Sequence, residues 1–161
     1  MPVPRLALLV VTLPLLLGSG ATRVPYPMPP DETTERWVSD LAGEDRSDRS
    51  YAARVLRSRV RVAVRQARRS DPGSLTHDEA LATLDTFDVL VVPACLQALG
   101  ARRVVGPCAD ILGLLTVPAA SGPLEALLGA GDAPGWCTRH RIERALRRIR
   151  EAIAPPSGDP S

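Results

Sequence analysis

Lysine is missing from this sequence, and aromatic residues are scarce. All twenty basic residues are arginines, and the 161 positions include only two tryptophans, two tyrosines and one phenylalanine. The apolar content is therefore mostly alanine, leucine and valine. Such small and medium aliphatic side chains suit closely packed helices better than a β-sandwich or barrel, where aromatic and β-branched residues are favoured. No segment shows a clean alternation of apolar and polar residues, so we expect an all-α fold.

The motifs of several enzyme classes are also missing. There is no pair of acids placed for hydrolysis, no glycine-rich phosphate loop and no Gly-x-Ser-x-Gly elbow. The motif Gly129-Ala130-Gly131 follows a predicted helix instead of a strand, so it does not match a dinucleotide-binding fingerprint. We therefore expect a protein that is not an enzyme and uses no cofactor.

The first 21 residues have the pattern of an export signal. Arg5 precedes the uncharged run 6–18, and the small residues Ser19, Gly20 and Ala21 follow it. A positive start, a short apolar run and small residues at the cleavage site are typical of secretory signals. The run is shorter than the roughly 20 residues of a membrane span. We expect cleavage after Ala21 and export to the periplasm or the medium. An uncleaved signal that anchors the chain at a membrane surface is the alternative.

Proline-rich segments bound the predicted domain. Residues 22–30 contain four prolines, and we assign 22–34 to an extended linker. Residues 155–161 have the composition of a disordered tail, which leaves a domain at 35–154. The net charge of the full chain is +2, and it falls to +1 when Arg5 is removed with the signal. A nearly neutral protein argues against nucleic acid as an obligatory partner.

Apolar periodicity predicts a series of short helices within this domain. They span residues 35–41, 48–69, 76–87, 89–99, 104–115, 122–128 and 136–153. Thr76 and Glu79 have the spacing of a capping box, while Asp88 and Ser121 are candidate caps for the helices that follow them. Pro93 is expected to bend its helix.

The predicted helix at 48–69 has one apolar and one arginine-bearing side. Five arginines cluster on the second side: Arg54, Arg57, Arg61, Arg65 and Arg68. Two interpretations stay open for them. They form a solvated face, or they form a docking stripe for an acidic protein, a polysaccharide or an anionic membrane surface. Arg59 points into the apolar half, so its stem reaches out to solvent or it pairs with a carboxylate of the next layer.

The segment 112–128, LGLLTVPAASGPLEALL, resembles the junction between two repeats in bacterial HEAT-repeat proteins. Residues 112–115 would end one inner helix, Pro118 and Ala120 would form the turn, and 123–128 would begin the next outer helix. The pattern Asp-x₃-Arg-x₂-Ala-Ala-x₂-Leu at 45–56 resembles a turn and inner helix of the same family. The resemblance covers about 36–153 and implies a short α-solenoid of three or four repeats. It also implies a curved surface that binds another protein, whose identity the sequence does not give.

Three cysteines in an exported chain make a disulfide plausible. Cys95 and Cys108 flank the turn at Gly100 and form the favoured pair. Cys108 and Cys137 occupy similar places in successive repeats and form the second choice. Three buried thiols are the remaining possibility. Together with His140, the three cysteines also suggest a zinc site. The alternative function is therefore a small exported metal- or thiol-dependent protein that uses Cys108, Cys137 and His140.

Overall fold

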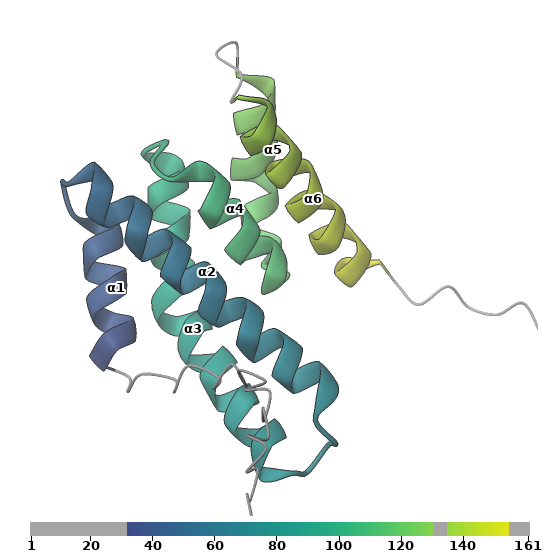
Figure 1. Ribbon diagram of the computed structural model, residues 1–161. Helices are drawn as coiled ribbons and strands as arrows, with labels where there is room; N and C mark the ends of the chain where they lie inside the picture. Colours follow the sequence, from purple (N-terminus) through teal and green to yellow (C-terminus); the bar gives the residue numbers. More distant parts are fainter. Residues whose placement is uncertain (1–31, 131–134, 155–161) are drawn as a thin grey trace, which may run out of the picture.

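The computed structural model describes residues 32–130 and 135–154, which are almost entirely helical and contain no strand (Figure 1). The predicted all-α fold is confirmed. The predicted signal at 1–21, most of the linker and the tail at 155–161 lie outside the described residues. The elements are α1 (Glu32–Ala42), α2 (Arg46–Arg69), α3 (Leu75–Gly100), α4 (Val105–Leu114), a 3₁₀ turn η1 (Pro118–Ala120), α5 (Ser121–Gly129) and α6 (Trp136–Ile153).

The six α-helices form three consecutive pairs that stack side by side (Figure 1). In each pair the two helices pack against each other: α1 with α2, α3 with α4, and α5 with α6. The first helices also contact one another in sequence, α1 with α3 and α3 with α5. The second helices do the same, α2 with α4 and α4 with α6. We call these two layers the first-helix row (α1, α3, α5) and the second-helix row (α2, α4, α6).

Helix α4 lies at the centre of the second-helix row and is largely buried. Cys108, Ile111 and Leu112 have no exposed surface. A Cβ atom at Gly113 would lie 2.6 Å from the Cα of Ala145 in α6, so only glycine allows the two backbones this close an approach. The position of α6 therefore depends on residue 113 being a glycine, which has no side chain.

Helix α3 corrects the prediction of two helices at 76–87 and 89–99. It is one helix of 26 residues, and Asp88 lies in its interior instead of capping a new helix. Ser74 is its N-cap, and the Ser74 hydroxyl accepts a hydrogen bond of 3.2 Å from the backbone N–H of His77. The predicted capping box of Thr76 and Glu79 is therefore wrong by two residues.

A continuous buried face explains why α3 does not break. Ala80, Phe87, Val91, Cys95 and Leu99 are buried, and the last four recur every four residues on one side of the helix. Packing along this face outweighs the local tendency of aspartate or threonine to start a helix. Proline 93 is tolerated inside the helix and is exposed to solvent.

The ends of two other helices also differ from the prediction. Helix α1 begins at Glu32, three residues inside the predicted linker, and Thr34 is buried. The Thr34 hydroxyl accepts a hydrogen bond of 3.3 Å from Arg59, so this arginine pairs with a hydroxyl instead of a carboxylate. Burial lowers the pKa of Arg59. Ser121 is the first residue of α5 and not its cap, because η1 leads directly into the helix.

None of the described helices combines the length and the hydropathy that crossing a bilayer requires.

Candidate anion-binding site

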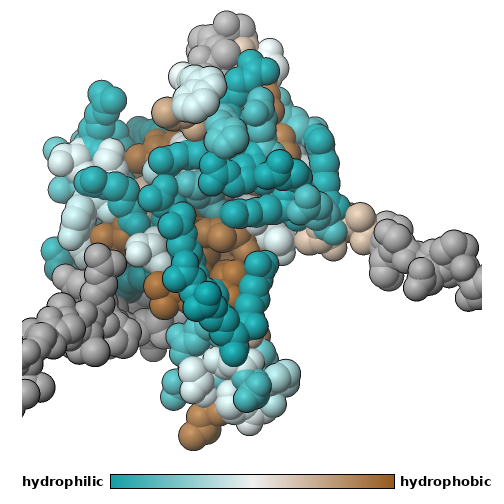
Figure 2. All heavy atoms as spheres, turned by 45° about the vertical axis from the view of Figure 1, so that its right-hand side comes forward, coloured by the Kyte–Doolittle hydropathy of each residue, from teal (hydrophilic) through white to brown (hydrophobic). Residues whose placement is uncertain are grey.

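The five predicted arginines form a stripe along the exposed side of α2, which we call the arginine stripe (Arg54, Arg57, Arg61, Arg65 and Arg68). Four of them are exposed, and Arg57 is half-buried. Among the described residues, Arg57 is the only member that forms an ion pair with a carboxylate. Figure 2 shows hydrophilic side chains spread over this side of the molecule, around a small apolar hollow. The stripe therefore presents positive charge that the described part of the fold does not neutralise.

The two helix rows carry charges of opposite sign. The second-helix row contains fifteen arginines and four acidic residues, whereas the first-helix row contains one arginine and eight acidic residues. The near-neutral net charge of the chain hides this separation. A partner that approaches the second-helix row meets a strongly positive surface, and the field there decides what it attracts.

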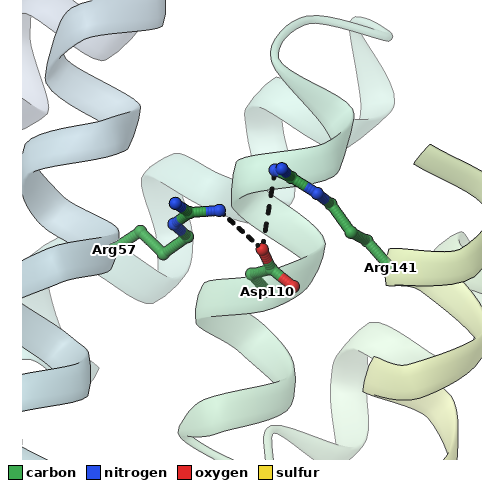
Figure 3. A network of polar contacts seen from close by, with 3 residues as sticks. All are labelled: Arg57, Asp110 and Arg141. Carbon is green, nitrogen blue, oxygen red and sulfur yellow. Dashed lines mark hydrogen bonds and ion pairs between the residues drawn. The ribbon is translucent and has the colours of Figure 1, made fainter. Parts of the chain in front are cut away.

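A buried carboxylate joins the three helices of the second-helix row. Asp110 of α4 lies between Arg57 of α2 and Arg141 of α6, as Figure 3 shows. The Arg57 guanidinium donates a hydrogen bond of 3.0 Å to Oδ2 of Asp110, and Nη1 of Arg141 lies 3.6 Å from the same oxygen. The Asp110 side chain is only 9% exposed. A carboxylate at this depth requires such partners, because burial of an unpaired charge is costly.

Next to Asp110 the surface opens into a cleft of about 510 Å³ at the N-terminus of α4. Helix α2, the turn before α4 and the start of α6 all contribute to it. Its lining consists of Ser50, Arg54, Arg57, Arg102, Val104, Val105, Gly106, Pro107, Gly135, Thr138 and Arg141. Four guanidinium groups from three parts of the chain therefore converge on one concave site.

The start of α4 adds backbone donors to the cleft. Val104, the N-cap residue, has a left-handed backbone with φ of 41° and provides no side-chain cap. In the described part of the chain, no acceptor receives a hydrogen bond from the backbone N–H of Val105 or Gly106. Free N–H groups and the helix dipole favour an anion at this end of a helix.

Sequence reasoning found part of this site. The arginine stripe contains Arg54 and Arg57, but Arg102, Asp110 and Arg141 were not among the predicted site residues. One signal was present: Asp110 is the only charged residue in the apolar segment 104–117. A single acid in such a segment, between two arginine-rich helices, indicates a buried ion pair.

Cys95 and Cys108 are both fully buried where α3 meets α4, and their thiols are hydrogen-bonded to each other as free thiols. The hydrogen bond with Cys108 and burial raise the pKa of Cys95 well above its usual value. Cys137 is exposed on α6. The contact agrees with the pairing that the sequence favoured, and the disulfide itself stays a prediction.

The predicted zinc ligands do not come together. Within residues 32–130 and 135–154, no group of three or more His, Cys, Asp or Glu side chains has a geometry suited to a metal ion. Cys137 is exposed, and His140 stacks on the indole of Trp136 with 6.1 Å between ring centroids and 9° between planes. The thiols of Cys95 and Cys108 contact each other in the core instead.

Comparison with known proteins provides no relative. No family model matches the sequence, and neither a curated protein nor a solved structure is detectably similar to it.

Proposed function

We propose that this protein is an exported, non-catalytic helical scaffold of the HEAT-like type, which binds an acidic surface of another protein along the arginine stripe. The observation that carries the proposal is the stripe itself, where among the described residues only Arg57 contacts a carboxylate. An arginine face that served only solubility would be expected to alternate with acids, as on α6, where Arg139 pairs with Glu143 and Arg147 with Glu151.

The arrangement of the helices supports a scaffold role. In a helical-repeat stack each pair covers the apolar face of the next, and successive second helices line one continuous surface. The two rows of this fold have that connectivity. The stripe spans about 21 Å along α2, at roughly 1.5 Å per residue. It matches in length an acidic helix or extended segment of a partner protein.

The spacing of the arginines favours a protein over a simple polyanion. Residues three and four apart lie on the same side of a helix, one turn above the next. An acidic helix with a carboxylate at every turn therefore pairs with the stripe one to one. Export, which the N-terminal pattern predicts, would also place the stripe away from cellular nucleic acid.

The test is the binding of a fluorescein-labelled polyglutamate peptide, measured by anisotropy at several salt concentrations. We expect the triple variant Arg61→Gln, Arg65→Gln and Arg68→Gln to lose about tenfold in affinity, and added salt to weaken the wild type steeply. The matched control is Arg139→Gln, Arg147→Gln and Arg150→Gln, which removes the same charge from arginines that already have glutamate partners.

Equal losses in the two triple variants would show that net charge decides binding, and would contradict a specific stripe. Salt-insensitive binding would contradict it as well. A duplex DNA of matched charge that binds more tightly than polyglutamate would assign the stripe to a different class of partner. Stoichiometric zinc in the purified protein would instead support the metal-dependent alternative.

A further inference from the structure

The cleft at the start of α4 has more positive charge than its own carboxylate neutralises. Arg54, Arg57 and Arg141 line it, and among the described residues the one carboxylate they contact is Asp110, which pairs with Arg57 and Arg141. Arg54 forms no ion pair within the described residues; its Nε donates to the backbone oxygen of Ser50 at 3.3 Å. Arg141 reaches Asp110 at 3.6 Å, which is an ion pair but longer than a good hydrogen bond. Among the described residues, these three arginines therefore exceed their one carboxylate by two positive charges.

The donors approach the cleft from different directions. Arg54 and Arg57 come from α2, Arg141 comes from α6, and the uncapped start of α4 lies between them. The hydroxyl-bearing residues Ser50 and Thr138 also line the wall. A planar carboxylate has two oxygens in one plane, whereas a phosphate group directs its oxygens to several sides and can accept from all of these donors.

The size and the wall of the cleft point to an organic ligand. Its volume of about 510 Å³ lies within the range of small-molecule sites and greatly exceeds a bare phosphate ion. Val104, Val105 and Pro107 form an apolar wall next to the charged groups. A ligand with one phosphate and a small carbon skeleton can contact both the charged groups and the apolar wall of the cleft.

We propose that this cleft binds the phosphate monoester of a small organic molecule. The phosphate lies against Arg54 and Arg141 at the start of α4, and the carbon skeleton lies against the apolar wall. Asp110 holds Arg57 and Arg141 in place and also competes with the ligand for them. This proposal and the acidic-partner proposal share Arg54 and Arg57, but their tests are separate, because the peptide test removes Arg61, Arg65 and Arg68, which do not line the cleft.

The experiment is isothermal titration calorimetry with glycerol 3-phosphate, with glycerol and inorganic phosphate as comparison probes. We expect glycerol 3-phosphate to bind, inorganic phosphate to bind more weakly, and glycerol not to bind. Arg54→Ala should weaken the binding about tenfold, while the control Arg61→Ala, on the same stripe but outside the cleft, should change it less than about twofold.

Asp110→Asn provides a second readout, whose expected effect is opposite in sign to that of Arg54→Ala. It removes the competing carboxylate, so glycerol 3-phosphate should bind several-fold more tightly although the protein loses stability. Circular dichroism checks that this variant folds; if it does not fold, the comparison of Arg54→Ala with Arg61→Ala decides alone.

The phosphate group could belong to a soluble molecule or to a lipid headgroup. Flotation with vesicles that contain phosphatidic acid distinguishes these two sources. Binding of glycerol 3-phosphate without vesicle binding assigns a soluble ligand, and Arg54-dependent vesicle binding assigns a lipid headgroup; both support the site. No heat with millimolar glycerol 3-phosphate and no flotation would overturn the proposal. Equal losses for Arg54→Ala and Arg61→Ala, or weaker binding in folded Asp110→Asn, would also overturn it.

Discussion

The two helix rows pack against each other yet differ in the sign of the charge they carry. Helix α2 has nine arginines and one acid, whereas its neighbour α3 has four acids and no arginine. No ion pair joins α2 to α3 among the described residues. The only ion pair between the rows in the described part of the chain is the exposed pair of Arg150 in α6 with Glu125 in α5, so charge contributes little to holding the rows together. What holds the rows is apolar burial, and the charges remain available for other molecules.

The contact between α4 and α6 offers the largest test of how the second-helix row is built. Gly113→Ala places a methyl group 2.6 Å from the Cα of Ala145, so a backbone must shift. We expect a loss of about 2 kcal/mol in the free energy of unfolding, measured by urea denaturation. The control is Gly122→Ala, which meets nothing within 4 Å and should stabilise α5 by up to about 1 kcal/mol. Equal effects in the two variants would contradict the close approach.

A disulfide between Cys95 of α3 and Cys108 of α4 would change the stability of the fold by a similar amount. If Cys95 and Cys108 form a disulfide in the exported protein, they close a short loop and stabilise the fold by up to about 3 kcal/mol. Reductant should then lower the melting temperature of the wild type and of Cys137→Ser, but not that of Cys95→Ser. Mass spectrometry after alkylation without reduction should find one free thiol. Three alkylated cysteines would contradict the pairing.

Asp110→Ala tests the ion pairs that join the three second helices. The change leaves Arg57 and Arg141 close together without the carboxylate between them, and we expect a loss of about 1 to 2 kcal/mol in urea denaturation. Both arginines are partly exposed, so water limits the cost. The control Glu143→Ala breaks an exposed pair with Arg139 and should cost less than about 0.5 kcal/mol. Similar losses would show that Asp110 has no special structural role.

Asp88, on the acidic side of the first-helix row, should have the smallest effect on the free energy of unfolding. Burial, and to a lesser extent the charge of Asp85, raise the pKa of Asp88, so the folded state holds this proton more tightly than the unfolded chain does. The charged form therefore reduces stability at neutral pH. Asp88 is only partly desolvated and lies on the exposed side of α3, so solvent screening keeps the effect small: Asp88→Asn should gain at most about 0.5 kcal/mol at pH 7 in thermal or urea unfolding. The gain should shrink as the pH falls below the raised pKa, where the wild type is protonated too. A gain that does not change with pH would contradict this cause.

The sequence predicted most of the fold where periodicity and breaks agreed. Helix α6 has the predicted bounds of 136 and 153, because a glycine-rich break precedes it and prolines follow it. Helix α3 was divided wrongly, since Asp88 has the chemistry of a cap but lies on the exposed side of a helix whose other side is continuously buried. Local cap signals do not contain that tertiary information.

The site was predictable only in part for a similar reason. Periodicity along a single helix was enough to find the arginine stripe. The cleft depends on Arg57, Asp110 and Arg141, which lie on three helices and are brought together only by the stacking of the rows. Long-range packing of this kind leaves no spacing pattern in the chain. The lone aspartate within an apolar segment was the one local sign of it.

The separation of charge between the rows has a consequence for the protein in bulk solution. A protein with one basic and one acidic side attracts other copies, the basic side of one to the acidic side of the next, even when its net charge is zero. Near the isoelectric point, where most proteins simply stop repelling each other, this one should form transient chains and scatter light at low ionic strength. Added salt should clear such a solution, because ions screen the attraction between unlike sides. Solubility would then rise with salt instead of falling, and purification in dilute buffer would lose material that moderate salt retains.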